Sequence, residues 1–186
     1  MKAMPVKFEK LPPDYFDSSQ RSWNPLRAYY HSNRYAKIRR FISARFRDGM
    51  RILDLGCGSS SWNTAHLPLE GVDQNKSMLE YGKEKGNLSR TVAWDLMDTP
   101  LPFKDGSFDF IVVSEVLEHL QNPGRILIDA RRLLKKNGML IITVPIDTRF
   151  SAWRILFGIE CIVWGDLLGD ELYRNRCGHI RHFSEN

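Results

Sequence analysis

Short apolar runs alternate with amphipathic stretches over residues 51–145. Most of the runs stop at a glycine, an acid or a serine, which is typical of buried strands that end in turns. The expected strands are 51–55, 69–73, 91–95, 108–114 and 139–145. Helices are expected between them at 77–85 and from Pro123 to the residues before Gly138. Strands that alternate with helices predict an α/β fold with a parallel sheet covered on both faces.

A long helix is expected before the first strand. In residues 26–47 the aliphatic and aromatic side chains recur at spacings of one, three, four and five, and basic residues occupy the other face. Asp48 and Gly49 end this helix. Residues 1–25 mix prolines, aromatics and charges without a clear period. We therefore expect an irregular arm over 1–25 and one domain over 26–186.

Composition restricts the class of protein. Of the 186 residues, 42% are hydrophobic and 26% are charged, which disfavours wholesale disorder. The three cysteines form no CxxC pair, so a disulfide scaffold and a zinc ribbon are disfavoured and a reducing compartment fits better. The N-terminus has no signal-peptide core, and charges interrupt the apolar stretch 150–169. We expect a cytoplasmic protein, whose net charge of +5 permits an anionic partner without requiring one.

The first candidate site is the turn after the first strand. Gly56 and Gly58 allow a tight turn and the close approach of a ligand. The next strand ends in Asp73, a carboxylate able to accept hydrogen bonds from both hydroxyls of a ribose. Together these features predict a cofactor that contains a nucleoside. A dinucleotide fingerprint would have a third glycine where this chain has Ser61, and the sequence has no Gly-Lys-Ser or Gly-Lys-Thr phosphate loop.

Four segments in a fixed order make this prediction more specific. They are ILDLGCG (52–58), GVDQNKSML (71–79), WDLMDTPLPFKDGSFDFIVVSEVLEHL (94–120) and LLKKNGMLIITVP (133–145). The series resembles the class I S-adenosylmethionine-dependent methyltransferases, most closely the type 11 branch that includes ubiquinone-biosynthesis methyltransferases. The resemblance implies a Rossmann-like, doubly wound and mostly parallel sheet, with S-adenosyl-L-methionine as the cofactor.

The resemblance also implies which residues hold this cofactor. Asp54 would hold the amino group of the methionine part, Asp73 the ribose hydroxyls and Asp95 the adenine amine. The full implied set is Asp54, Gly56, Cys57, Gly58, Asp73, Gln74, Asp95, Leu96, Ser114 and Glu115. Simpler roles stay open at three places: the glycines as a turn alone, Asp73 as a helix cap near Ser77, and Asp95 as a turn acid.

Two residues after the fourth strand are candidates for catalysis. A base is needed only if the accepting atom carries a proton that must leave, and His119 is the best candidate because its ordinary pKa is near neutrality. Glu118 precedes it. The alternative is that Glu118 and His119 only bond backbone groups at a helix entry.

A metal site is a further alternative for the same residues. Glu115, Glu118 and His119, with His179 or His182 brought over by the fold, form a set of divalent-metal ligands. Small-RNA 2′-O-methyltransferases use a similar Glu-x-x-Glu-His element with a downstream histidine. The segment GHIRHFS (178–184) also resembles the metal-free small-molecule branch, so we expect no metal.

The last part of the chain is the part most specific to this sequence. Residues 146–177 are long, aromatic and apolar, so we expect an insertion on the acceptor side that covers a hydrophobic acceptor or meets a membrane surface. A helical hairpin packed on the sheet is the simpler alternative. The sequence ends at Asn186, before the last two strands of the family pattern. We therefore expect a sheet without them, with either a homodimer through the open edge or marginal stability.

The expected function is transfer of a methyl group to an oxygen or carbon of a small-molecule or lipid-like acceptor, an activity of the EC 2.1.1 class. Two alternatives stay open. One is an RNA or protein methyltransferase that uses the basic face of helix 26–47, for which binding would depend on salt. The other is a non-catalytic module that binds the cofactor or acts as a scaffold.

Overall fold

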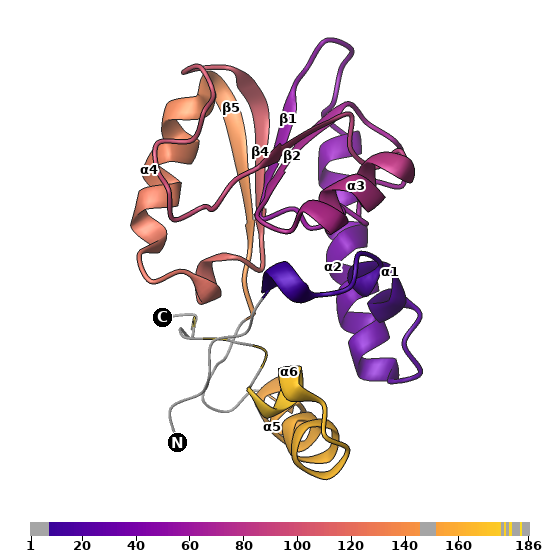
Figure 1. Ribbon diagram of the computed structural model, residues 1–186. Helices are drawn as coiled ribbons and strands as arrows, with labels where there is room; N and C mark the ends of the chain where they lie inside the picture. Colours follow the sequence, from indigo (N-terminus) through magenta and orange to yellow (C-terminus); the bar gives the residue numbers. More distant parts are fainter. Residues whose placement is uncertain (1–7, 146–151, 176, 178, 180–182, 184–186) are drawn as a thin grey trace. The chain divides into compact units, whose positions relative to one another are not determined.

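The computed structural model describes residues 8–145, 152–175, 177, 179 and 183 (Figure 1). Their contacts divide them into two compact units. The larger unit holds residues 8–114 and 122–143, and the smaller one holds 115–121 with the described residues from 144 onward.

A five-stranded parallel sheet forms the centre of the larger unit. Its strands are β1 (Ile52–Leu55), β2 (Leu69–Asp73), β3 (Arg90–Ala93), β4 (Phe108–Ser114) and β5 (Leu134–Thr143). They lie in the order β3-β2-β1-β4-β5, and all four pairings are parallel. The expected α/β class with a doubly wound parallel sheet is confirmed. The strand order changes direction between β1 and β4, which is where ligands bind in folds of this kind.

Helices cover both faces of this sheet, α4 on one side and α2 and α3 on the other (Figure 1). They are α2 (Pro25–Ser43), α3 (Lys76–Glu84) and α4 (Pro123–Leu133). In α2, Ile38 and Ile42 are buried in one cluster with Ile52 and Phe110 of the sheet. Burial on both faces explains why β1 and β4 are almost continuously apolar.

The helix starts follow from short polar side chains. Asn24 accepts hydrogen bonds from the amides of Leu26 and Arg27, and Pro25 occupies the first helical position of α2. Asn122 precedes Pro123 as expected, but its side chain makes no capping bond. At the other end, α4 stops at Leu133, and Lys135 belongs to an irregular start of β5 rather than to the last helical turn.

The arm expected to be irregular contains regular structure. A 3₁₀ turn, η1 (Phe8–Lys10), and helix α1 (Tyr15–Gln20) come before α2. The side chain of Asn75 donates to the carbonyls of Phe8 and Leu11, and Tyr81 donates to the carboxylate of Asp17. These bonds attach the segment to α3 and the loop before it. Six helical residues are too few to show a period, which explains the wrong expectation.

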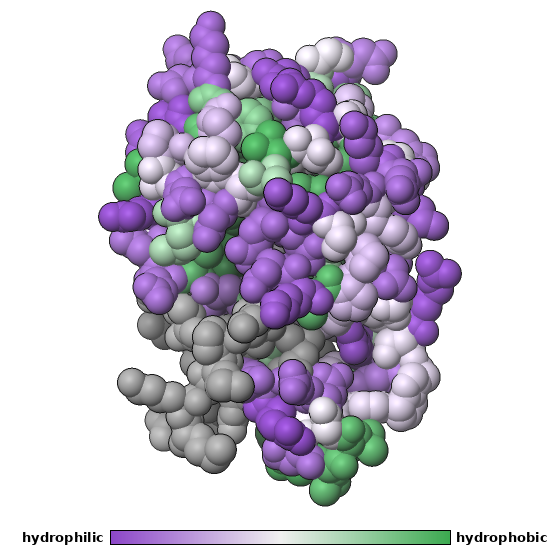
Figure 2. Space-filling model, viewed as in Figure 1, coloured by the Kyte–Doolittle hydropathy of each residue, from purple (hydrophilic) through white to green (hydrophobic). Residues whose placement is uncertain are grey.

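The smaller unit is helical. It contains the 3₁₀ turn η2 (Leu117–His119), helix α5 (Ala152–Glu160), the π-helical segment η3 (Cys161–Leu167) and α6 (Glu171–Arg174). A Cβ at Gly165 would lie 2.5 Å from the backbone nitrogen of Arg174, so this glycine allows η3 and α6 to pack as a hairpin. Exposed apolar side chains gather on α5 and η3, among them Ile155, Ile159 and Ile162 (Figure 2). Among the described residues, no helix combines the length and apolarity needed to cross a membrane.

Candidate functional site

The carboxyl ends of four parallel strands lie along one edge of the sheet. Leu55 at the end of β1 pairs with Val72 and with Val113, and Asp73 at the end of β2 pairs with Ala93. Residues that follow these strands therefore share one edge of the larger unit. It is the edge at which the sequence places the cofactor.

The glycine turn after β1 has the conformation that its sequence predicts. Gly56 and Gly58 have φ angles of 69° and 51°, in the left-handed region that favours glycine. The amides of Gly56 and Cys57 both donate to the carbonyl of Val72, which ties the turn to β2. Residues 56–68 then form successive turns and no helix. A dinucleotide site of the usual kind places its pyrophosphate on a helix N-terminus here, so this loop does not provide one.

Asp73 links the two loops at this edge. Its carboxylate accepts a hydrogen bond of 2.7 Å from the amide of Gly58 and one of 2.8 Å from the amide of Asn75. The cap of α3 is Asn75, which accepts from the amide of Met78, so the interpretation of Asp73 as that cap is wrong. Burial raises the pKa of Asp73, while the two amide bonds oppose this effect. The bonds also fix the orientation of the carboxylate.

Asp54 is buried beneath the same turn. One carboxylate oxygen, Oδ2, accepts 2.8 Å hydrogen bonds from Ser60 Oγ and from the indole nitrogen of Trp62. Burial raises the pKa of Asp54 to about 7; these two bonds lower it, and the charge of Asp73 adds to the increase. Burial also raises the pKa of the Cys57 thiol, with Asp73 and Asp54 adding to the effect. Cys57 is therefore a packing residue of the turn and not a nucleophile.

Asp54 is buried, Asp73 is half-buried, and the charge of Asp73 raises the pKa of Asp54; such a pair of acids favours a cationic ligand. The ionised form of each carboxylate raises the free energy of the other, and a positive charge placed beside them would relieve this cost. The carboxylate of Asp73 also keeps lone pairs beyond its two amide bonds, as hydroxyl donors require. The pair therefore suits a ligand that carries both a cation and hydroxyl groups.

The remaining predicted residues lie at or just after the ends of β2, β3 and β4. Gln74 is exposed, Leu96 is buried, and Asp95 is exposed and accepts a 2.8 Å bond from the amide of Met97. That bond gives Asp95 a turn role, whatever ligand it also contacts. Ser114 Oγ lies 2.8 Å from Thr143 Oγ1 at the end of β5. The chain continues into Glu115, whose φ of 57° is rare for a residue with a side chain.

The sequence analysis missed the part of the site that α1 and α2 supply. The ring of Phe16 lies against Gly58, where a Cβ would approach its Cε2 atom to 2.5 Å. From α2, Arg34 is close enough to lower the pKa of Asp54. Burial, with the charges of Arg34 and Arg27, lowers the pKa of His31 to about 3, so this ring is neutral. Asp14 before the first turn was an available sequence signal for α1.

Contact with Phe16 predicts a measurable effect at Gly58. We expect Gly58→Ala to lower the free energy of unfolding by more than about 1 kcal/mol, because it adds a clash to the backbone strain of a positive φ. Gly106→Ala is the matched control, since Gly106 has a φ of 61° and no atom within 4 Å of its added Cβ. Denaturant unfolding of both variants checks this.

A double variant separates the clash with Phe16 from the backbone strain of the positive φ. Gly58→Ala should cost less stability in a Phe16→Ala background than in the wild type, whereas Gly106→Ala should cost the same in both backgrounds. Equal losses in the two single glycine variants would contradict the packing of Phe16 on the turn.

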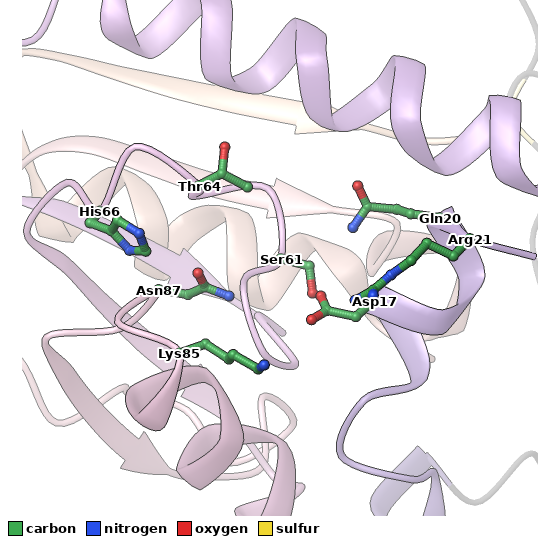
Figure 3. A pocket seen from close by; sticks show the side chains of 8 residues that line it. All are labelled: Asp17, Gln20, Arg21, Ser61, Thr64, His66, Lys85 and Asn87. Carbon is green, nitrogen blue, oxygen red and sulfur yellow. The ribbon is translucent and has the colours of Figure 1, made fainter.

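A separate hollow of 390 Å³ lies beside this turn (Figure 3). Asp17 of α1, Arg21 just after it, Ser61 of the loop, and Lys85 and Asn87 after α3 are among the residues that line it. Its lining side chains are of polar types and carry both signs of charge, and none belongs to a predicted cofactor residue. It therefore provides no second argument for a nucleoside.

In the smaller unit, two predicted catalytic residues lie together on η2. Glu118 is fully buried, and Oε1 of its carboxylate lies 3.8 Å from Nε2 of His119. His179 is close to both, whereas His182 lies outside the described residues. The structure therefore brings one of the two candidate downstream histidines to the pair.

The sequence is similar to those of known methyltransferases. The profile of a family described as "Methyltransferase domain" matches residues 53–142. A ubiquinone/menaquinone biosynthesis C-methyltransferase of Geotalea uraniireducens is 31% identical over 134 residues, which are 65% of this chain and 57% of that protein. A demethylmenaquinone methyltransferase of Staphylococcus haemolyticus is 34% identical over 135 residues, 64% of this chain and 55% of that protein. The chain thus spans a little over half the length of these curated relatives.

Solved structures agree on the fold. A Thermotoga maritima protein described as an S-adenosylmethionine-dependent methyltransferase, possible histamine N-methyltransferase, has a TM-score of 0.59 at 22% identity. The alignment covers 91% of this chain and 74% of that one. The YcgJ protein of Bacillus subtilis has a TM-score of 0.58 at 24% identity, with 83% and 63% covered.

Proposed function

We propose that this chain is a class I methyltransferase of the type 11 branch, which transfers a methyl group from S-adenosyl-L-methionine to a small molecule; the match of residues 53–142 to the methyltransferase family and the similarity to the curated relatives support this. The observation that carries the proposal is the pair Asp54 and Asp73 at the glycine turn. The cofactor has a cationic sulfonium, an ammonium group and two ribose hydroxyls, and these are the groups that such a pair accepts.

Each residue at the edge then has one task. Asp73 accepts the ribose hydroxyls, and its bonds to Gly58 and Asn75 hold it in the required orientation. The charge of Asp54 favours the cationic methionine part. Gly56 and Gly58 allow that part to approach the backbone. Alignment of donor and acceptor is the main requirement of an in-line displacement.

The acceptor is proposed from the relatives. The printed names of the two curated proteins describe quinone biosynthesis, which suggests a small and apolar acceptor for this chain. The apolar surface of α5 and η3 supports a lipid-like molecule or contact with a membrane surface. We keep Glu118 and His119 as the residues that act on the acceptor side.

The remaining expectations on partners stay predictions. The open edge of β5, where Ile142 is 41% exposed, supports the proposed homodimer. Nucleic acid is less favoured, because two arginines of the basic segment 26–47 already make contacts: Arg39 of α2 donates to Thr64, and Arg45, just after α2, lies over the ring of Phe41. A cytoplasmic location is the expectation for a protein of this composition.

Calorimetry tests the cofactor directly. S-adenosylhomocysteine and S-adenosylmethionine should bind with one site per chain, and NAD⁺ should give no heat of binding, because the loop after β1 has no helix for its pyrophosphate. Binding of NAD⁺, without binding of S-adenosylmethionine or S-adenosylhomocysteine, would overturn the proposal. Labelled methyl transfer to quinone precursors, with RNA as the comparison, would then identify the acceptor class.

A further inference from the structure

Three metal-ligating side chains converge in the smaller unit. The ligand atoms of Glu118, His119 and His179 all lie within 4.8 Å of one another. Glu118 and His119 are neighbours on η2, whereas His179 comes 179 − 119 = 60 residues later. A local sequence pattern does not produce such a cluster, because the fold of this unit has to bring the third side chain to the other two.

The spacing is close to that of a metal site. Bonds of about 2.0–2.2 Å to nitrogen and oxygen place ligand atoms roughly 3–3.5 Å apart around one ion. In the structure the ligand atoms of the three side chains lie within 4.8 Å of one another, and Glu118 Oε1 is 3.8 Å from His119 Nε2. Small rotations of the side chains would bring these atoms to the separations found around an ion. Two imidazoles and one carboxylate suit Zn²⁺, Mn²⁺ and Fe²⁺, and three protein ligands leave positions open for another molecule.

The surroundings hold the ligands in place. The ring of His179 stacks on Phe157 of α5, with centroids 5.8 Å apart and planes 15° apart. The rings of His119 and His179 are 5.2 Å apart between centroids. Because Glu118 is fully buried, its carboxylate is shielded from water, which strengthens its attraction for a cation.

We propose that Glu118, His119 and His179 bind one divalent transition-metal ion with an open coordination position. The metal site itself does not depend on the proposed function. Its role does: we propose that the ion binds the methyl acceptor through a hydroxyl oxygen. Metal coordination lowers the pKa of that hydroxyl, whose proton leaves to solvent. The ionised oxygen is the nucleophile that O-methylation requires. The ligand class proposed for this site is therefore a hydroxyl compound.

This assignment replaces the role predicted for His119. A histidine whose nitrogen binds a metal does not take a proton with that nitrogen, so His119 is a ligand and not the base. It departs from the expectation of no metal, and it uses His179 as the downstream ligand because His182 lies outside the described residues. Glu115 lies outside the cluster of three.

Binding of Mn²⁺ to the whole chain tests the site. Mn²⁺ prefers nitrogen and oxygen ligands, so the three cysteines do not compete as they would for Zn²⁺. Electron paramagnetic resonance titration should find one bound ion per chain. We expect His119→Gln and His179→Gln each to weaken binding at least about tenfold, a typical loss of one ligand interaction. His66→Gln is the matched control, since His66 is exposed and its Nδ1 lies 3.0 Å from the carbonyl of Gly86.

Circular dichroism and the binding of S-adenosylhomocysteine to the same samples separate the outcomes. A folded wild-type chain that shows no saturable Mn²⁺ binding overturns the metal site, and so does binding that His179→Gln leaves unchanged. Cofactor binding without metal binding defeats this inference alone. Metal binding without cofactor binding leaves the site in place and defeats the proposed function. If His119→Gln fails to fold, His179→Gln carries the test, because His179 lies outside the helices of the unit.

Discussion

Asp73→Ala is expected to weaken the binding of S-adenosylhomocysteine by at least about 100-fold. The variant removes a charged acceptor of two ribose hydroxyls, and hydrogen bonds to a charged group contribute about 1.5–3 kcal/mol each. It also frees the amides of Gly58 and Asn75, so the glycine turn loses its bond to the loop after β2. Calorimetric titration measures the affinity, and thermal unfolding measures the loss of stability.

Asp109→Ala separates the two effects. Asp109 also accepts an amide bond, from Arg51, together with one from Lys135, but it lies at the start of β4, at the opposite edge of the sheet. This variant should lose stability and keep its affinity. If both variants keep their affinity, or both lose it in proportion to their stability, Asp73 has no direct part in binding.

The sequence predicted the sheet well because burial on two faces leaves a simple signal. Strands β2 and β4 have the predicted bounds, since their mostly buried segments end at the polar residues Asp73 and Ser114. The start of β5 was wrong. There the chain between Leu134 and Met139 departs from regular pairing with β4, and two lysines in that stretch resemble the end of a helix.

The site was predictable only where its residues follow one another in a motif. Gly58 and Asp73 belong to an ordered series, so their positions after β1 and β2 could be inferred. Phe16 and Gly58 are in contact although they lie 42 residues apart in the sequence (58 − 16). Phe16 belongs to a six-residue helix, which is too short for its hydrophobic pattern to predict this contact. The meeting of His179 with Glu118 has the same cause. Such contacts depend on tertiary packing, which local patterns do not encode.

The hydrogen bonds of Asp54 show a further limit. The sequence implies that this carboxylate faces the cofactor, but one of its oxygens already accepts from Ser60 and Trp62. Trp62 is fully buried, and it stands in the loop where a dinucleotide-binding chain would begin a helix. The indole thus supplies a donor that holds a buried acid within the core. Asp54 thus accepts bonds within the turn and is also proposed to attract the ligand. Keeping its charge buried for the ligand lowers the free energy of unfolding.

Asp54→Asn is therefore expected to stabilise the folded chain at pH 8 while weakening the cofactor. The folded pKa is about 7 against an ordinary 3.8, so between these values the folded state keeps a proton that the unfolded state has lost. The free energy of unfolding then falls as pH rises from 4 to 7, by roughly 4 kcal/mol in full, since one pKa unit corresponds to about 1.4 kcal/mol. The amide oxygen of asparagine still accepts from Ser60 and Trp62 without carrying this charge.

Thermal unfolding of the wild type and of Asp54→Asn at pH 5 and pH 8 measures this change in stability. The contributions of the other titrating groups cancel in the difference between the melting temperatures of the two proteins. At pH 8 the variant should melt at least about 5 °C higher, and at pH 5 the gap should narrow because the wild-type acid is then protonated. Its affinity for S-adenosylmethionine should fall at least about tenfold at pH 8, since the negative charge that favours the cation is gone. A variant that is less stable than the wild type at both pH values would contradict the raised pKa. One with unchanged affinity would assign Asp54 to the turn alone.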